Sequence, residues 1–372
     1  MQNKKFLNLF FLYSAYLWFT SFSQSVLPTH FLAQGLSLSQ MMLAKIILFL
    51  AQTLILFKLT VFRSKLAWKL AIICQILFIF LVIKIYSPLQ LYLASALSGL
   101  ALYFFYVFYN IAHFEETPKE KRGYSSALMF SLPTFISIVG PILAGFILFR
   151  NQNFFWILSG VFFILAFNSA GKQPNFQLEY NLVSGLKEIK ATRLLILIEG
   201  VWEALPIGLV PIFTLYFIKT PLEYGIYLTY LSLIGIVANL LLGGLTDRVQ
   251  KRAIFLYPLT IAMLLITLFF TSATGSIYRW AIVTGSLSFL LPIFWNVSTA
   301  LVVDSHPNLK IAIPARELML ALGRSLGLFL LFLSFIFEPV PYYIFYVLAG
   351  VLALYPLILF WNSKVVKRFR YL

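Results

Sequence analysis

Glu199, Glu203 and Arg324 are charged residues inside long apolar segments, which makes them the strongest candidates for chemistry. Glu199 and Glu203 are four residues apart, so a helix would carry them on one face. Glu203 follows Arg193 by ten residues, which places it about 15 Å along its helix. Arg324 follows Pro314 by the same interval and is expected at a similar depth.

Charged groups at such a depth usually pair with each other, line a pathway or carry a proton. We therefore expect one or both glutamates to pair with Arg324 or to exchange a proton. A structural ion pair that joins two helices and has no other role is the alternative. Lys45 and Lys58 lie nearer the ends of their apolar segment, where a lysine can extend its amine to the membrane surface.

Polar and aromatic side chains in other apolar segments suit contact with an organic molecule. They are Tyr16, Thr20, Gln24, Tyr106, Asn110, Trp295 and Asn296. Tyr16, Thr20 and Gln24 recur every four residues and would form one polar stripe on a helix. Hydrogen bonds between helices, with the aromatic rings facing lipid, are the alternative interpretation.

The sequence lacks the patterns of the common catalytic and metal sites. His30, His113 and His306 are not spaced as metal ligands, and Cys74 is the single cysteine. No Ser-His-Asp arrangement, phosphate-binding loop or dinucleotide fingerprint is present. We therefore expect no catalytic residue, no metal and no cofactor.

The composition indicates that a membrane protein holds these residues. Of the 372 residues, 61% are hydrophobic and 11% are charged, whereas about a quarter of a soluble domain is charged. Segments 46–56 and 256–270 are apolar on all sides, unlike the alternating strands of a transmembrane barrel. We therefore expect an all-α polytopic membrane protein.

Twelve apolar segments are long enough to cross the bilayer as helices, which takes about 20 residues each. They are 6–27, 38–60, 66–86, 88–113, 124–149, 153–170, 193–218, 223–245, 253–273, 277–303, 314–337 and 340–362. The longest loop lies between the sixth and the seventh segment. We therefore expect an N-terminal six-helix bundle (1–170), a cytoplasmic central loop (171–192) and a C-terminal six-helix bundle (193–372).

The two halves show a weak internal repeat. Asn110, near the end of the fourth segment, corresponds to Asn296 in the tenth, and Arg122 at the start of the fifth corresponds to Arg316 at the start of the eleventh. Their shared order and spacing favour a duplication, and hence two pseudo-symmetric bundles.

The distribution of basic residues predicts the orientation in the membrane. The formal net charge is +16. Twenty-one Lys and Arg residues fall on the side that would hold both termini, against four on the opposite side. Because Lys and Arg accumulate in cytoplasmic loops, we expect both termini in the cytoplasm and an even number of spans. The same asymmetry accounts for the positive charge without binding to nucleic acid.

Residues Gly243 to Arg252 read GGLTDRVQKR and resemble the loop G-x-x-x-D-R-x-G-R/K-R/K of the major facilitator superfamily, with Gln250 in place of the second Gly. A carboxylate in such a turn can reach a neighbouring helix N-terminus, where unpaired amides favour an anion. The resemblance implies a gating role for Gly243, Asp247, Arg248 and Arg252. A charged turn without that role is the alternative.

Residues Gly140 to Gly145 read GPILAG and resemble the G-P-x-x-G-G motif that the family shows mainly in exporters and antiporters, with Ala144 in place of one Gly. Gly140 and Gly145 would let helices approach closely, and Pro141 would bend the helix. This explanation by packing stands beside the inference that the chain is an exporter.

The resemblance implies a carrier that moves a small organic solute across the cell membrane by alternating access, around a site lined by the helices of Tyr16, Asn110, Glu203 and Asn296. We expect coupling to protons, export rather than uptake, and a monomer in the lipid bilayer. An uptake carrier of the same fold is one alternative. A polytopic membrane enzyme or scaffold is the other, and we expect the chain not to be an enzyme.

Overall fold

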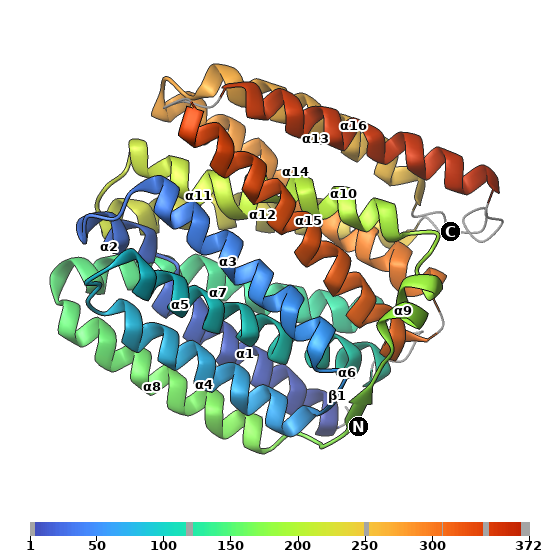
Figure 1. Cartoon of the computed structure of the whole chain (residues 1–372), viewed down its shortest axis with the longest axis horizontal. Coiled ribbons are helices and arrows are strands. Elements are labelled where there is room, and N and C mark those ends of the chain that lie inside the picture. The colour runs from blue at the N-terminus through green and yellow to red at the C-terminus, as the bar shows by residue number, and fades with distance from the viewer. Residues whose placement is uncertain (1–3, 117–121, 249–252, 307, 338–341, 366–372) are drawn as a thin grey trace. The chain divides into compact units, whose positions relative to one another are not determined.

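The structure, a computed structural model, describes residues 4–116, 122–248, 253–306, 308–337 and 342–365 and is almost entirely helical (Figure 1). Side chains are described for all of these except 4–6, 114–116, 122–134, 240–248, 253, 304 and 363–365. The chain forms two compact units, each built from its own set of packed helices.

The first unit comprises Met1–Tyr180 and Ile218–Leu233. Its elements are α1 (Lys4–Gln24), α2 (Leu27–Ala33), α3 (Leu38–Lys58), β1 (Val61–Arg63), α4 (Ser64–Val82), α5 (Pro88–Leu102), η1 (Tyr103–Val107), α6 (Phe108–Glu116), α7 (Arg122–Arg150), α8 (Gln152–Gly171), β2 (Gln177–Glu179) and the first part of α12 (Pro221–Arg248).

The second unit comprises Asn181–Phe217 and Ile234–Leu372. Its elements are α9 (Leu182–Glu188), α10 (Arg193–Ala204), η3 (Leu205–Leu209), α11 (Val210–Phe213), η4 (Thr214–Tyr216), the rest of α12, α13 (Ala253–Ala273), α14 (Ile277–Ser305), α15 (Leu309–Phe337) and α16 (Tyr342–Val365). The domain limits at 170 and 193 stay a prediction.

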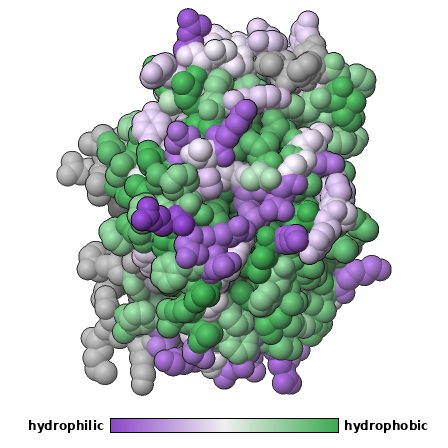
Figure 2. Space-filling view, turned by 90° about the vertical axis from the view of Figure 1, so that its left-hand side faces the viewer, coloured by the Kyte–Doolittle hydropathy of each residue, from purple (hydrophilic) through white to green (hydrophobic). Residues whose placement is uncertain are grey.

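Ten helices in the described part of the chain are long and apolar enough to cross a membrane. They cover every predicted segment except 6–27 and 124–149, which α1 and α7 occupy. Large apolar side chains such as Phe80, Ile157 and Phe269 are exposed, and apolar residues cover much of the face drawn in Figure 2. A surface of this kind is stable in lipid and would aggregate in water.

Polar residues at the helix starts explain where several helices begin. The Ser37 hydroxyl accepts a hydrogen bond from the Gln40 amide at 3.2 Å, and the Gln40 side chain accepts one from the Ser37 amide at 2.8 Å. This capping box starts α3. Asn151 and Asn181 cap α8 and α9 with their side-chain oxygens.

Two of the long helices contain a π-helical turn, η1 in the segment that starts at Pro88 and η3 in the segment that starts at Arg193. A π turn adds one residue to a helical turn and therefore rotates the side chains that follow it. Pro206 lies in η3, and its missing amide hydrogen favours such an irregular hydrogen-bond pattern. Turns of this kind are frequent at functional sites.

The segment after α8 pairs with the segment after α3. β1 and β2 form a two-stranded antiparallel sheet in which Phe62 is opposite Leu178. The Tyr180 hydroxyl donates to the backbone carbonyl oxygens of Leu56 at 2.8 Å and Leu59 at 3.1 Å, at the end of α3. Burial raises the pKa of Tyr180 to about 12, so this hydroxyl keeps its proton at neutral pH.

Candidate functional site

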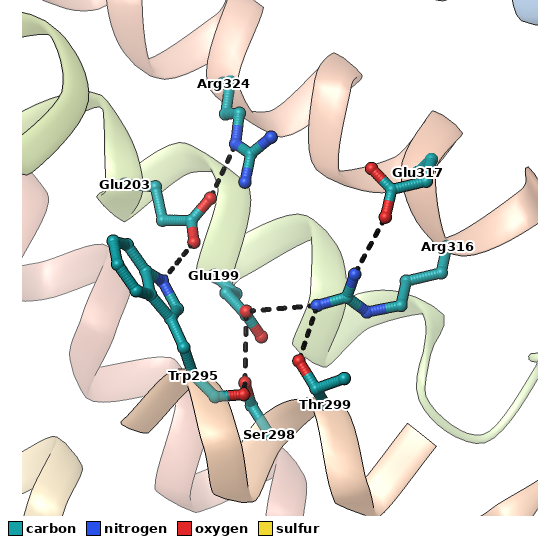
Figure 3. Close-up of polar contacts among 8 residues, drawn as sticks. All are labelled: Glu199, Glu203, Trp295, Ser298, Thr299, Arg316, Glu317 and Arg324. Carbon is teal, nitrogen blue, oxygen red and sulfur yellow. Dashed lines mark hydrogen bonds and ion pairs between the residues drawn. The ribbon is translucent and has the colours of Figure 1, made fainter. Parts of the chain in front are cut away.

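Three helices of the second unit bring a set of charged and polar side chains together in its interior (Figure 3). The residues come from α10, α14 and α15. They are Glu199, Glu203, Trp295, Ser298, Thr299, Arg316, Glu317 and Arg324, which we call the ion-pair network.

Glu203 lies at one end of the network, with both carboxylate oxygens engaged. The Arg324 Nε donates to Oε2 at 2.6 Å, and the Trp295 indole Nε1 donates to Oε1 at 2.5 Å. Glu203 is 1% exposed. A carboxylate this deeply buried needs such charged or hydrogen-bonding partners to remain ionised.

Glu199 and Arg316 form the second part of the network. Glu199 accepts a hydrogen bond from the Ser298 hydroxyl at 3.1 Å, and its Oε1 lies 3.9 Å from a terminal nitrogen of Arg316. Arg316 also donates to Glu317 at 2.9 Å and to the Thr299 hydroxyl at 3.0 Å. One guanidinium is therefore shared by two carboxylates.

The charges of the ion-pair network do not cancel when all its members are ionised. Glu199, Glu203 and Glu317 carry three negative charges, whereas Arg316 and Arg324 carry two positive ones. An unbalanced charge inside a membrane protein is costly, so a bound proton or cation would stabilise the network. In the described part of the chain no group of three or more His, Cys, Asp or Glu residues could hold a metal ion.

Close packing of α10 against α15 holds the charged residues opposite each other. A Cβ atom added at Gly200 would lie 2.6 Å from the Leu320 carbonyl oxygen, and one added at Gly323 would lie 2.5 Å from the Leu197 carbonyl oxygen. A Cβ added at Gly327 would overlap the backbone of α10. Only glycine allows this approach, so the backbones next to Glu203 and Arg324 have little freedom to separate.

Candidate residues of the first unit form a separate polar and aromatic cluster. Gln24 donates to the Gln75 side-chain oxygen at 2.6 Å, and Gln75 donates to the Tyr16 hydroxyl at 3.4 Å. Tyr16 is fully buried and stacks on Phe105, with ring centroids 3.5 Å apart. The Thr20 hydroxyl instead donates to the Tyr16 backbone oxygen of its own helix, at 3.0 Å.

Tyr106 and Asn110 lie in η1 and α6, beside this cluster. The Tyr106 ring meets the rings of Tyr16 and Phe105 edge-on, at centroid distances of 6.2 and 5.3 Å. Both Tyr106 and Asn110 are half-buried, so part of each side chain stays accessible. The π turn η1 ends three residues before Asn110 and sets the direction of this helix face.

Asn296 in the second unit makes a contact that the sequence analysis did not anticipate. Its side-chain nitrogen donates to the Asn239 oxygen of α12 at 3.4 Å. Trp295, its neighbour, points its indole nitrogen at Glu203 and so belongs to the ion-pair network.

Sequence reasoning also missed most of the network around Arg316. That residue was placed only at the start of the eleventh apolar segment, and Glu317, Ser298 and Thr299 were not singled out. A signal for Glu317 existed, because it precedes Arg324 by seven residues and therefore lies on the same face of a helix.

The predicted gating residues lie at the edge of the described structure. α12 remains helical through Arg248, so Gly243, Asp247 and Arg248 belong to its last two turns, where the side chains are not described. Arg252 lies outside the described residues.

The GPILAG motif packs against the first part of α12, in the first unit, through Pro141 and Gly145. A Cβ atom at Gly145 would overlap the Pro221 carbonyl oxygen, and one at Gly225 would overlap the Pro141 carbonyl oxygen. Thr229 adds a hydrogen bond from its hydroxyl to the Ile138 carbonyl oxygen at 2.8 Å. Gly140 packs against Ser21 of α1.

Comparisons with known proteins agree with this architecture. A bacterial homologue of the iron transporter ferroportin, in an outward-facing state, matches 97% of this chain and 100% of its own at a TM-score of 0.70 and 15% identity. The E. coli fucose:proton symporter FucP matches 96% and 98% at 0.67 and 13% identity. The nucleoside transporter NupG matches 98% and 100% at 0.66 and 12% identity.

At these identities the likeness to solved structures establishes the fold alone. A search of curated protein sequences gives no significant match. The sequence model of the Major Facilitator Superfamily, however, matches residues 9–308, which is most of the chain. The chain therefore belongs to the Major Facilitator Superfamily, and it is a multi-pass membrane transporter and not an enzyme.

Proposed function

We propose that this transporter is a proton-coupled carrier that moves a small organic solute across the cell membrane by alternating access. The observation that supports proton coupling is the ion-pair network, whose three carboxylates outnumber its two guanidinium groups. One proton bound to Glu199 or Glu203 makes the network neutral. Binding and release of that proton would then accompany the two states of the carrier.

Proteoliposomes containing the purified protein and an internal pH indicator test this proposal. We expect solute entry to acidify the lumen or alkalinise it, according to whether protons move with the solute or against it. Glu203→Gln removes the titratable group but keeps its shape, so proton movement should be lost while solute exchange without a gradient continues. Glu223→Gln is the matched control and should leave proton movement unchanged. Glu223 is an equivalent carboxylate at the start of α12, where it accepts a hydrogen bond from the Thr220 hydroxyl at 2.7 Å. Unchanged proton movement in both Glu203→Gln and Glu199→Gln would refute the assignment.

We further propose that Asn110, Tyr106 and Asn296 contact the solute. The half-buried side chains of Asn110 and Tyr106 support this role, as does the π turn beside them. Tyr16 and Gln24 would support the site from behind, since their contacts go to Phe105 and Gln75. Asn110→Ala should then raise the solute concentration needed for half-maximal transport, whereas Thr20→Val should not.

We propose twelve spans, a monomer, both termini in the cytoplasm and a gating role for the end of α12 and the loop that follows. The supporting observations are α1 and α7, which are helical over the two predicted segments outside the ten spans, and the basic residues on one side. The gating residues would be Gly243, Asp247, Arg248 and Arg252. Asp247→Asn should then slow transport without changing solute binding. If the residues only form a charged turn, Asp247→Asn should leave the transport rate unchanged.

Export is the direction that we propose. The support is the GPILAG motif and its tight packing on α12 at Gly145 and Gly225. Inside-out and right-side-out vesicles from cells that express the protein distinguish the two directions. Accumulation in inside-out vesicles, under a proton gradient imposed in either direction, corresponds to export, and accumulation only in right-side-out vesicles would establish uptake.

A further inference from the structure

Arg324 is the charged member of the ion-pair network that reaches furthest toward the surface of the second unit. Its side chain is 20% exposed, against 1% for its partner Glu203. Glu199 and Glu317 are buried as well. A solute that approaches the network therefore meets a guanidinium before it meets a carboxylate.

An anion can compete with Glu203 for Arg324. The contact between Arg324 and Glu203 runs from Nε to Oε2, while the other carboxylate oxygen accepts from Trp295. Glu203 thus divides its oxygens between two donors. A guanidinium has five N–H groups in a planar fork and forms its best contacts with carboxylate or phosphate groups through two parallel hydrogen bonds. An anion that binds in this bidentate way can replace Glu203.

The packing of α10 on α15 makes an exchange of side-chain partners the available movement. Gly200 and Gly323 bring the two backbones into contact next to the pair. Helix separation would break this seam, whereas rotation of the Arg324 side chain would not. Arg324 also lies near the middle of the 29-residue helix α15, at a depth where a solute-binding group of a carrier is expected.

Loss of the guanidinium would leave Glu203 as a buried, uncompensated carboxylate. The titratable and charged groups around it are Glu199 on its own helix, Arg316, Glu317 and Arg324 on α15, and Tyr355 on α16, which interacts with Glu199 and Arg316. The groups that α14 contributes, Trp295 and Ser298, do not titrate in water. Two other carboxylates share the one remaining guanidinium, so uptake of a proton by Glu203 itself is the way to remove this uncompensated charge.

We propose that the solute is an organic anion whose carboxylate or phosphate group binds Arg324 in place of Glu203, while Glu203 takes up one proton. No covalent bond changes, and the anion and the proton enter the network as a neutral pair. This inference rests on the proposed carrier function and names the substrate class that its site selects.

Four probes that share a phenyl ring test the charge preference: benzoate, phenylphosphonate, benzylammonium and benzyl alcohol. Each is added to the purified full-length protein in detergent at equal concentration and ionic strength, and the shift of the unfolding temperature is measured. We expect benzoate, phenylphosphonate or both to stabilise the protein more than the cation and the alcohol do. Stabilisation by benzylammonium instead, or by neither anion, would overturn the proposal.

Substitutions at Arg324 locate the site. Arg324→Lys keeps the charge and the pairing with Glu203 but loses the planar fork, so anion affinity should fall about tenfold or more. Arg324→Gln should abolish the anion effect. The control is Arg279→Gln, which removes an exposed cation on α14 and should leave the anion effect unchanged. An equal anion effect in wild type and in both Arg324 variants would exclude Arg324 as the binding group.

Proton uptake separates this proposal from a purely structural ion pair. In weakly buffered solution, wild-type protein should take up a proton for each anion bound, whereas Glu203→Gln should bind the anion with higher affinity and take up none. Anion binding with proton uptake but without transport in proteoliposomes would refute the carrier function and support the anion site. Transport of benzylammonium alone would support the carrier function and refute the anion site.

Discussion

The ion-pair network contains two guanidinium groups with different surroundings. Arg324 pairs with Glu203 at 2.6 Å and is partly exposed, which suits a group that changes partners. Arg316 contacts Glu317 at 2.9 Å and Glu199 at 3.9 Å, and it donates to the Thr299 hydroxyl. The side chain of Arg316 is less exposed than that of Arg324, so Arg316 is the better candidate for a purely structural role.

This difference predicts how Arg316 affects stability. Arg316→Gln leaves two buried carboxylates without their shared cation, and it should lower the free energy of unfolding by about 3 kcal/mol. Adding Glu317→Gln removes one of the unpaired charges, so the double variant should be more stable than the sum of the single variants implies. The free energies of unfolding of the wild type, the two single variants and the double variant are measured on purified protein in detergent. Additive effects would show that Arg316 and Glu317 do not interact energetically.

At the scale of elements, glycines decide which helices can approach closely. Gly327 of α15 faces the backbone of α10, and a Cβ atom there would overlap the Val201 carbonyl oxygen. Gly350 of α16 has open space around its Cβ position. Gly327→Ala should therefore lower the unfolding temperature, because the helices must move apart. Gly350→Ala should leave the unfolding temperature unchanged or raise it, because alanine is favoured over glycine in a helix by about 1 kcal/mol. Equal effects of the two substitutions would contradict the close approach.

The pairing of β1 with β2 connects the segment after α8 to the end of α3. Tyr180→Phe removes the hydroxyl that donates to Leu56 and Leu59 and should weaken this attachment by about 1 kcal/mol. Hydrogen exchange at the Ser64 amide, which donates to the Phe176 carbonyl oxygen, should then become faster. Tyr278→Phe, at an exposed tyrosine of α14, is the control. Unchanged exchange at Ser64 would show that the sheet does not depend on Tyr180.

For the whole molecule, the sequence predicted the depth of the charged residues along their helices better than it predicted their contact partners. Because the rise of a helix is constant, counting residues placed Glu203 and Arg324 at one height, and the structure has them in contact. The predicted start of the eleventh segment at 314 was too late, because α15 starts at Leu309 and includes Pro314 inside its first turns. The π turns at 103–107 and 205–209 lie in apolar sequence, where no change of hydrophobic periodicity marks them, although Pro206 is a local signal for the second.

Orientation in the membrane is a property of the whole chain, and its prediction depends on the distribution of basic residues. Cys74 is the only cysteine, so Cys74→Ser gives a background for single new cysteines. Lys84 and Lys187 are exposed and lie on opposite predicted sides. A membrane-impermeant maleimide added to intact cells should label Lys84→Cys, because the excess of Lys and Arg keeps the other side in the cytoplasm. Lys187→Cys should react only after permeabilisation, and the reverse pattern would invert the proposed topology.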